Sequence, residues 1–170
     1  MLWWGAGYGM ERREGSTMLK TGGCNCKTIR YQVTGKPLFV HVCHCRECQR
    51  DSGGAFNMTM LLLATDFQIT HGIPAEKRVT RLSGKQYFGY FCEQCGNPIY
   101  GAPVDPIGLI VLRPGTLDEI DQLQPQAHIW VQEKQPWVQI PKNVPSFAKE
   151  YNLYELWPAE SLTRMQSMSN

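Results

Sequence analysis

Long hydrophobic runs are absent from this 170-residue chain. No window approaches the roughly 18 apolar residues that a membrane-spanning helix needs. The first residues also lack the basic region, the apolar run and the small-residue cleavage site of a secretory signal peptide. These absences argue against a membrane partner and against secretion, and we expect a soluble protein of the cytoplasm.

A dense basic stripe is missing as well. The chain carries 17 Lys and Arg residues against 15 Asp and Glu residues, for a net charge of +2, and these residues are scattered along it. Proteins that bind a phosphate backbone concentrate positive charge on one face or along one helix. Nucleic acid is therefore not an expected partner.

Long amphipathic helices are also scarce. Before Pro145 no stretch keeps a helical apolar period for more than about three turns. We expect only a helical turn at 46–51 and a short helix within 146–156. From 28 to 34, by contrast, apolar and polar residues alternate, as in a strand with one buried face. Further extended segments are expected at 38–45, 55–64, 67–69, 79–82, 86–91, 98–104 and 107–112, so the fold is predicted to be mostly β.

The size and composition fit one domain. A chain of 170 residues with 42% hydrophobic residues can bury a core of its own. Glycines interrupt any period in 1–17, so we expect a disordered N-terminal appendage there, and Met18 is a candidate for the natural start. The domain is expected over 18–157, and the polar segment 158–170 is expected to be a flexible tail.

Seven cysteines are the most prominent feature that the sequence does contain. An odd number leaves one thiol without a disulfide partner, and a bridge within a CxC would close a strained ring. The crowded four-cysteine run of a ferredoxin is missing, which disfavours an iron–sulfur cluster. Thiolate ligands of zinc are therefore the favoured interpretation. The seven form three clusters: Cys24 with Cys26, Cys43 with Cys45 and Cys48, and Cys92 with Cys95.

Four of these thiols can close one tetrahedral zinc. Cys24 and Cys26 point to the same side of an extended segment. The CxxCG run at 92–96 has the form of a zinc knuckle, in which the glycine permits a positive φ. Joining the two pairs gives four thiolates and leaves no room for substrate, which predicts a structural zinc. A different partition of the seven thiols stays open, because spacing alone does not exclude it.

The remaining thiols, Cys43, Cys45 and Cys48, supply only three ligands. A second zinc held there would keep one position open, as catalytic and exchange-competent zinc sites do. His41 is an alternative fourth ligand, since it shares a strand face with Cys43 and Cys45, and it would make this site structural too. His44 is expected to face the other way, either packed or exposed to solvent.

The cysteine clusters and their flanks together resemble a known family. The matching residues run in order from about 22 to 137. They are Gly23-Cys24-Asn25-Cys26 before Ile29-Arg30-Tyr31, Cys43-His44-Cys45-Arg46-Glu47-Cys48 with Ser52-Gly53, Phe91-Cys92-Glu93-Gln94-Cys95-Gly96, and Ala127-His128-Ile129-Trp130 with Trp137. This pattern is similar to that of the glutathione-dependent formaldehyde-activating enzyme (GFA) family.

The resemblance implies a β-tent fold, a single domain of stacked antiparallel sheets held by zinc. It implies two Zn²⁺ per chain, one on Cys24, Cys26, Cys92 and Cys95, and the other on Cys43, Cys45 and Cys48. It also implies a carbon–sulfur lyase that condenses glutathione with formaldehyde to S-hydroxymethylglutathione, with the thiol on the second zinc. Because the family is broad, another small thiol or another small carbonyl is an open alternative.

The chemistry of such a substrate suggests which residues would contact it. Zinc turns a bound thiol into a thiolate near neutral pH without a histidine base. Glutathione brings two carboxylates, for which guanidinium and amide N–H groups are suitable partners. The sequence candidates for these contacts are Arg46, Arg50, Ser52, Gly53 and Gly54. Trp130 and Trp137 are expected to pack in the core or at its rim.

A competing hypothesis is a zinc-stabilised module that binds a thiol or a protein without turnover, because a fold does not dictate a function. Both zincs would then be structural. The two hypotheses differ in the fourth ligand of the second zinc, which is substrate in one case and a protein group such as His41 in the other. The sequence makes no prediction about the oligomeric state.

Overall fold

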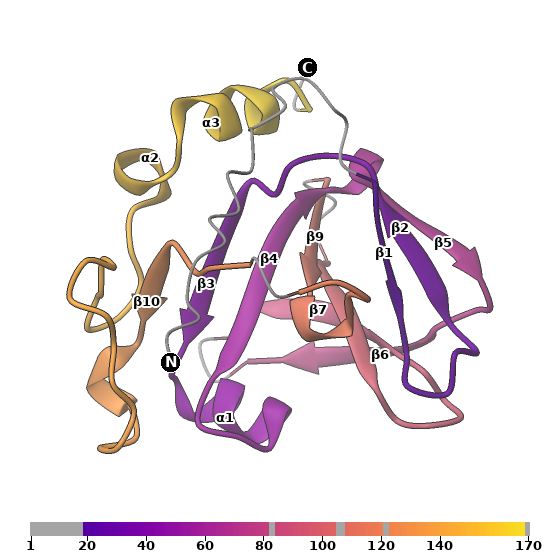
Figure 1. The fold of residues 1–170 in the computed structure, drawn as a ribbon, viewed down its shortest axis with the longest axis horizontal. Coiled ribbons are helices and arrows are strands. Elements are labelled where there is room, and N and C mark those ends of the chain that lie inside the picture. Colours follow the sequence, from indigo (N-terminus) through magenta and orange to yellow (C-terminus); the bar gives the residue numbers. More distant parts are fainter. Residues whose placement is uncertain (1–18, 82–83, 105–107, 121–122, 169–170) are drawn as a thin grey trace, which may run out of the picture.

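The computed structural model describes residues 19–81, 84–104, 108–120 and 123–168 (Figure 1). The expected N-terminal appendage, residues 1–17, lies outside this part of the chain. Strands dominate the described residues, as the alternating patterns predict. None of the described helices is long and apolar enough to cross a membrane.

The described strands form two sheets that share one core (Figure 1). The three-stranded sheet has the order β1 (Lys20–Gly23), β2 (Arg30–Val33) and β5 (Phe67–His71). The seven-stranded sheet has the order β10 (Ala127–Ile129), β3 (Phe39–Cys43), β4 (Asn57–Leu63), β9 (Leu109–Leu112), β8 (Pro98–Pro103), β7 (Gln86–Phe91) and β6 (Ala75–Thr80). The prediction of a mostly β domain with stacked sheets is therefore confirmed.

One strand pair departs from the expected antiparallel arrangement. β10 pairs with β3 in parallel, with Ala127 opposite His41 and Ile129 opposite Cys43. Every other pair of named strands in the described chain is antiparallel. In the chain, β10 follows β9 after a long connection, so no hairpin joins β10 to β3. Parallel neighbours need a long connection of this kind, because a tight turn joins only antiparallel strands. The result places β10 beside the strand that carries Cys43.

The core lies between the two sheets. Tyr31 and Val33 of β2 are each 1% exposed, and they belong to one cluster with Met60 and Leu62 of β4, which are both 0% exposed. Successive side chains of a strand point to opposite faces. The residues of β2 that alternate between polar and apolar in the sequence therefore also alternate between partly exposed and buried in the structure. The opposite face of β4, which carries Thr59, is left for a functional site.

Helices in the described chain are short. The predicted helical turn is present as α1 (Arg46–Ser52), and the predicted helix before residue 157 is present as α2 (Leu153–Leu156). The remaining helical segments are η1 (Ala64–Asp66), η2 (Pro114–Thr116), η3 (Val131–Glu133) and α3 (Ala159–Gln166). In Figure 1, α1 lies at the foot of β3 and β4, and α2 and α3 lie near their other ends.

The structure has a packed helix where the sequence predicted a flexible tail. Leu162 and Met165 of α3 pack in the same cluster as Phe39. The Arg164 guanidinium donates to the Asp66 carboxylate over 2.7 Å. Arg164, one of the polar residues that suggested a tail, forms this ion pair. Leu162 and Met165 are three positions apart, so they lie on the same side of the helix and both meet the sheet.

We predict that Trp157→Ala lowers the free energy of unfolding by about 3–5 kcal/mol, because it removes a large side chain from the core. Trp157 is 7% exposed and stacks on Phe39 with ring centroids 5.7 Å apart. The matched control is Trp137→Ala, which should change stability by no more than about 0.5 kcal/mol because Trp137 is 71% exposed. Urea unfolding measures both values, and equal effects would contradict the packing of this segment.

Candidate functional site

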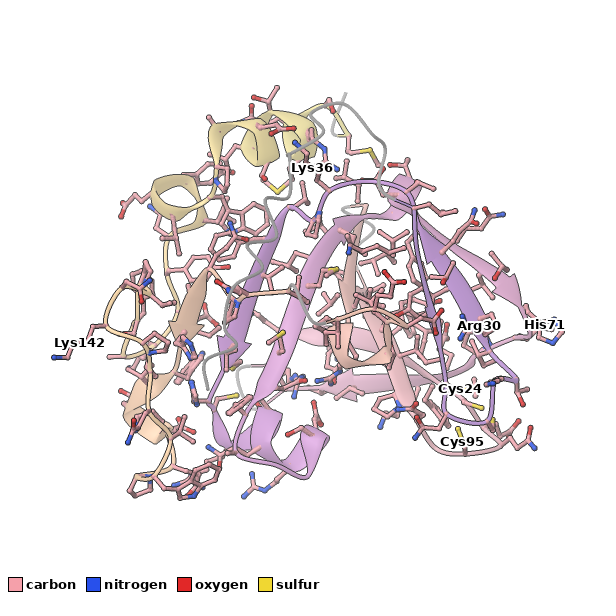
Figure 2. The ribbon with its side chains drawn as sticks, in the orientation of Figure 1. Cys24, Arg30, Lys36, His71, Cys95 and Lys142 are labelled. Atoms are coloured by element: carbon pink, nitrogen blue, oxygen red, sulfur yellow. The ribbon has the colours of Figure 1, made fainter. Side chains whose placement is uncertain are left out.

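The first cysteine cluster joins the two sheets. Cys24 and Cys26 lie between β1 and β2, and Cys92 and Cys95 lie between β7 and β8. The sulfur of Cys26 is 3.4 Å from that of Cys24 and 3.6 Å from that of Cys92. All four sulfurs lie within 4.8 Å of one another. Figure 2 shows Cys24 and Cys95 close together at the lower right, so the two pairs meet as the sequence predicted.

Backbone hydrogen bonds shape the two turns that carry these thiols. The amide of Gly96 donates to the carbonyl oxygen of Cys92 over 2.8 Å, and Gly96 has a φ of 72°, the left-handed conformation predicted for it. In the other turn, the amide of Ile29 donates to the sulfur of Cys24 over 3.2 Å. Both turns therefore hold their sulfurs toward a common point.

The second cluster forms at the junction of β3 and α1. Cys43 ends β3, Cys45 is the N-cap of α1, and Cys48 lies in the first turn of that helix. The sulfur of Cys45 accepts a hydrogen bond from the backbone N–H of Cys48 over 3.4 Å, in the manner of a capping side chain. The helix ends at Gly53, whose φ is 65°. The helical turn predicted at 46–51 therefore returns Cys48 to Cys45.

Both clusters fit a zinc ion. A tetrahedral zinc with bonds of about 2.3 Å separates its sulfurs by roughly 3.8 Å. The sulfur separations of 3.4 Å and 3.6 Å in the first cluster are close to this value, and the three sulfurs of the second lie within 4.8 Å of one another. All seven cysteines are free thiols. One donor set can close a tetrahedron, and the other is one ligand short.

His41 stands apart from the second cluster. Within the described residues, the group there that could hold a metal contains only the three cysteines. The Nδ1 atom of His41 instead lies 3.0 Å from the hydroxyl oxygen of Tyr151. Burial lowers the pKa of His41 to about 4, so its ring is neutral near pH 7. This arrangement gives no support to the alternative in which His41 is the fourth ligand.

A buried histidine pair lies beside the second cluster. His44 is fully buried, and its Nε2 is 2.9 Å from Nδ1 of His128. In the described part of the chain, Nδ1 of His44 has no partner. If Nε2 of His44 carries the ring proton, the unpaired Nδ1 is an acceptor and no buried N–H is left without a partner. We therefore assign His44 as the donor to His128. Burial lowers the pKa of both rings, and that of His44 falls to about 4.

Gln49 connects α1 to neighbouring segments through hydrogen bonds. Its amide group donates to the carbonyl oxygens of His44 over 2.6 Å and of Glu133 over 3.0 Å, and its side-chain oxygen accepts from Gln135 over 2.8 Å. The backbone N–H of Arg46 donates to the Glu133 carboxylate over 2.7 Å. These bonds position the cysteines of α1. No local sequence pattern points to Gln49, because two of its partners lie 84 and 86 residues further along the chain.

A groove of about 680 Å³ opens beside Cys48. Thr59 and Val111 line it, whereas their neighbours Met60 and Leu112 face the core. The groove therefore lies on the face of the seven-stranded sheet that is turned away from the core. Its charged lining residues are Arg50, Lys77, Arg81, Lys85 and Arg113, with Asp51 as the single acid. The excess of cations makes it suitable for an anionic ligand.

Asp51 orders two of these cations. Its carboxylate lies 2.9 Å from Arg81 and 3.5 Å from Arg113. The guanidinium of Arg81 also lies over the ring of Tyr87, 4.7 Å from its centroid. Two guanidinium groups are thus fixed within the groove and retain donors for a ligand.

The thiol that borders the groove ionises readily. A hydrogen bond with Cys43 lowers the pKa of Cys48 to about 7, burial opposes this shift, and the charges of Arg81 and Arg113 reinforce it. The same hydrogen bond and burial raise the pKa of Cys43. The thiolate is the form that binds a metal, so one ligand of this cluster is close to its binding form at neutral pH.

The predicted substrate contacts fall in different places. Arg50 lines the groove, whereas Arg46 bonds within α1. Ser52, Gly53 and Gly54 are exposed and lie outside the groove lining. Their role in binding stays a prediction.

Several residues that line the groove could not be recognised from the sequence. Lys77, Arg81 and Arg113 belong to no short motif, and only the pairing of β6 to β9 brings them to one face with Cys48. Of the two tryptophans expected to pack, Trp130 contacts the cluster of Cys43 and Cys48, whereas Trp137 is 71% exposed.

The fold and the two thiol clusters define a mostly β protein with two candidate metal centres. The chain belongs to the glutathione-dependent formaldehyde-activating enzyme family, whose sequence model matches residues 19–133. A comparison with curated proteins gives no match. Among solved structures, a protein from Rhodobacter sphaeroides aligns with a TM-score of 0.47 and 15% sequence identity, over 60% of this chain and 91% of that chain.

We predict that His128→Phe lowers the free energy of unfolding by about 1–3 kcal/mol, because it keeps the ring but leaves the Nε2 donor of buried His44 without a partner. The control is His71→Phe at an exposed position, which should shift stability by no more than about 0.5 kcal/mol. Chemical denaturation at pH 7.5 measures both. A neutral result for His128→Phe would refute the assigned hydrogen bond.

Proposed function

We propose that this protein is a zinc-dependent carbon–sulfur lyase that joins a small thiol to a small carbonyl, with glutathione and formaldehyde as the first candidates. The observation that carries the proposal is the placement of the three-thiol cluster at the wall of a cationic groove, through Cys48. Membership of the family supports the same substrates. Seven free thiols also suit a reducing compartment, so we propose a cytoplasmic location.

Two Zn²⁺ per chain are part of this proposal. Cys24, Cys26, Cys92 and Cys95 would hold a structural ion, and Cys43, Cys45 and Cys48 would hold the second. When bound to three thiolates, zinc can take a thiol as fourth ligand and lower its pKa, which supplies the nucleophile. His41 is not part of the group that could hold this ion, and its Nδ1 atom lies against the Tyr151 hydroxyl, which supports an open fourth position.

The reaction balances without an oxidant or a reductant. The sulfur of the thiol forms a bond to the carbonyl carbon, the π electrons of the carbonyl move to its oxygen, and the proton that the thiol released ends on that oxygen. The product from glutathione and formaldehyde is S-hydroxymethylglutathione. The protein residues would orient the thiol and limit its motion, while Gln49 keeps α1 in place.

The groove provides the anchors for the rest of the thiol substrate. Glutathione carries two carboxylates, and Arg81 and Arg113 are held near Cys48 by their common partner Asp51. Guanidinium groups bind carboxylates through paired hydrogen bonds. Arg50, on the same lining, is the sequence-predicted contact that fits this arrangement.

A turnover measurement tests the proposed function. NMR exchange spectroscopy with ¹³C-formaldehyde and glutathione reports the rate of S-hydroxymethylglutathione formation above the uncatalysed rate. We expect acceleration by the zinc-loaded protein and none by Cys48→Ser. Glutathione binding without acceleration would instead favour a binding module, and absence of both would reject thiol chemistry at this site.

Metal content provides a separate prediction. Native mass spectrometry should find two zinc ions in the wild-type chain, one in Cys48→Ser, and two in the neighbouring control Ser52→Ala. Cys95→Ser should lose the other ion and lower the melting temperature by roughly 10 °C or more, since a structural zinc contributes folding free energy directly. A wild-type chain with a single zinc would contradict the two-centre arrangement.

The groove gives a third test. Arg81→Ala should weaken glutathione binding about tenfold, the effect of losing one charge-assisted hydrogen bond of about 1.4 kcal/mol. Arg78→Ala, on exposed β6 and outside the groove lining, should change it by less than about twofold. Calorimetric titration at two salt concentrations measures both, because screening should weaken the Arg81 contribution. Equal losses in the two variants would exclude the groove as the carboxylate site.

A further inference from the structure

A second cavity lies on the same face of the seven-stranded sheet. It has a volume of about 540 Å³ and is bounded by that sheet on one side and by the segment that carries α2 and α3 on the other. The cavity and the groove share no lining residue, and none of the described cysteines lines the cavity. Much of its wall comes from residues after 133, beyond the part of the chain that the family model matches.

The walls of this cavity are mostly apolar. Leu61 and Leu109 line it from the sheet, Ile129 lines it from β10, and Trp157 and Met165 line it from the C-terminal segment. Cavities of about 300–1,000 Å³ with apolar walls and a few placed polar groups are the usual sites of small organic ligands. Its size and lining therefore fit such a ligand.

A chain of hydrogen bonds ends in the cavity. The indole N–H of Trp157 donates to the hydroxyl oxygen of Tyr151 over 3.1 Å, and that hydroxyl lies 3.0 Å from Nδ1 of His41. Trp157 uses one lone pair of the phenol oxygen, so we assign the phenol proton to the bond with Nδ1 of His41, and the ring proton of His41 then lies on Nε2. Among the described residues none pairs with Nε2, which is not sealed from solvent.

The charge at the rim restricts the ligand further. Glu150 lines the cavity and pairs with Lys85 at 3.5 Å, with its side chain 59% exposed. This ion pair presents no net positive charge to an anionic ligand, and the apolar walls disfavour a cation, which would lose its hydration without a buried partner. A neutral molecule with one hydrogen-bond acceptor meets both conditions.

We propose that this cavity is a binding site for a small, neutral and mostly apolar carbonyl compound, such as an aryl ketone. The apolar body fills the space lined by Leu61, Leu109 and Trp157, and the carbonyl oxygen accepts a hydrogen bond from Nε2 of His41. This site is separate from the thiol chemistry of the groove and does not depend on it.

Acetophenone and ethylbenzene form a matched pair of probes, since they have similar size and only the ketone has an acceptor. NMR titration of the zinc-loaded full chain follows the indole N–H signal of Trp157, identified by its loss in Trp157→Phe. We expect both probes to shift this signal in a saturable way. Acetophenone should bind about three- to tenfold more tightly, the gain from one neutral hydrogen bond.

Three variants locate the site. Leu109→Trp fills the cavity and should abolish binding of both probes, whereas Ile73→Trp, at a position that is 91% exposed, should leave both unchanged. His41→Phe should remove the preference for acetophenone and keep ethylbenzene within about twofold. Thermal unfolding of each variant confirms that it is folded.

Some outcomes overturn the proposal. Absence of saturable binding by either probe rejects the site. Equal affinity for the two probes in the wild type rejects the role of His41. Competition between acetophenone and glutathione would place the probe in the groove instead. This result does not depend on whether the protein turns over formaldehyde.

Discussion

Four thiols from turns of the two sheets converge at one point. Cys26 and Cys92 are 66 residues apart in the sequence, yet their sulfurs are 3.6 Å apart. One belongs to a turn of the three-stranded sheet and the other to a turn of the seven-stranded sheet. A link between distant segments restricts the unfolded chain more than a local one does. A metal ion here would hold the two sheets together at one end, whereas the apolar core holds them together along the rest of their length.

The three-thiol cluster differs because it is local in sequence. A link within Cys43, Cys45 and Cys48 restricts few conformations of the unfolded chain, so its geometry must come from the surroundings. Gln49 and the pair of His44 and His128 provide these surroundings through hydrogen bonds to the β10 region. A metal at the three-thiol site would thus be positioned by the surrounding protein, whereas a metal at the four-thiol site would itself help to hold the two sheets together.

Patterns within a few residues were predictable from the sequence, and contacts across the sheet were not. The alternation in β2, the CxC and CxxCG turns and the stop at Gly53 are set by local backbone geometry. Strand β1 was missed because Gly22 and Gly23 show no alternation, and only the fold reveals that Gly22 makes room for the Tyr31 ring. Lys77, Arg81 and Arg113 reach one groove through strand pairing, which no local pattern encodes.

The packing of the C-terminal segment has a further consequence. The segment 150–166 supplies seven of the eleven residues that line the apolar cavity and none of those that line the groove. Glu150 pairs with the groove residue Lys85 and Tyr151 packs against the cluster of Cys43 and Cys48, so substitutions that reshape the cavity alone are confined to the rest of this segment. In evolutionary terms, a cavity and a groove with separate linings could vary in turn, one without the other.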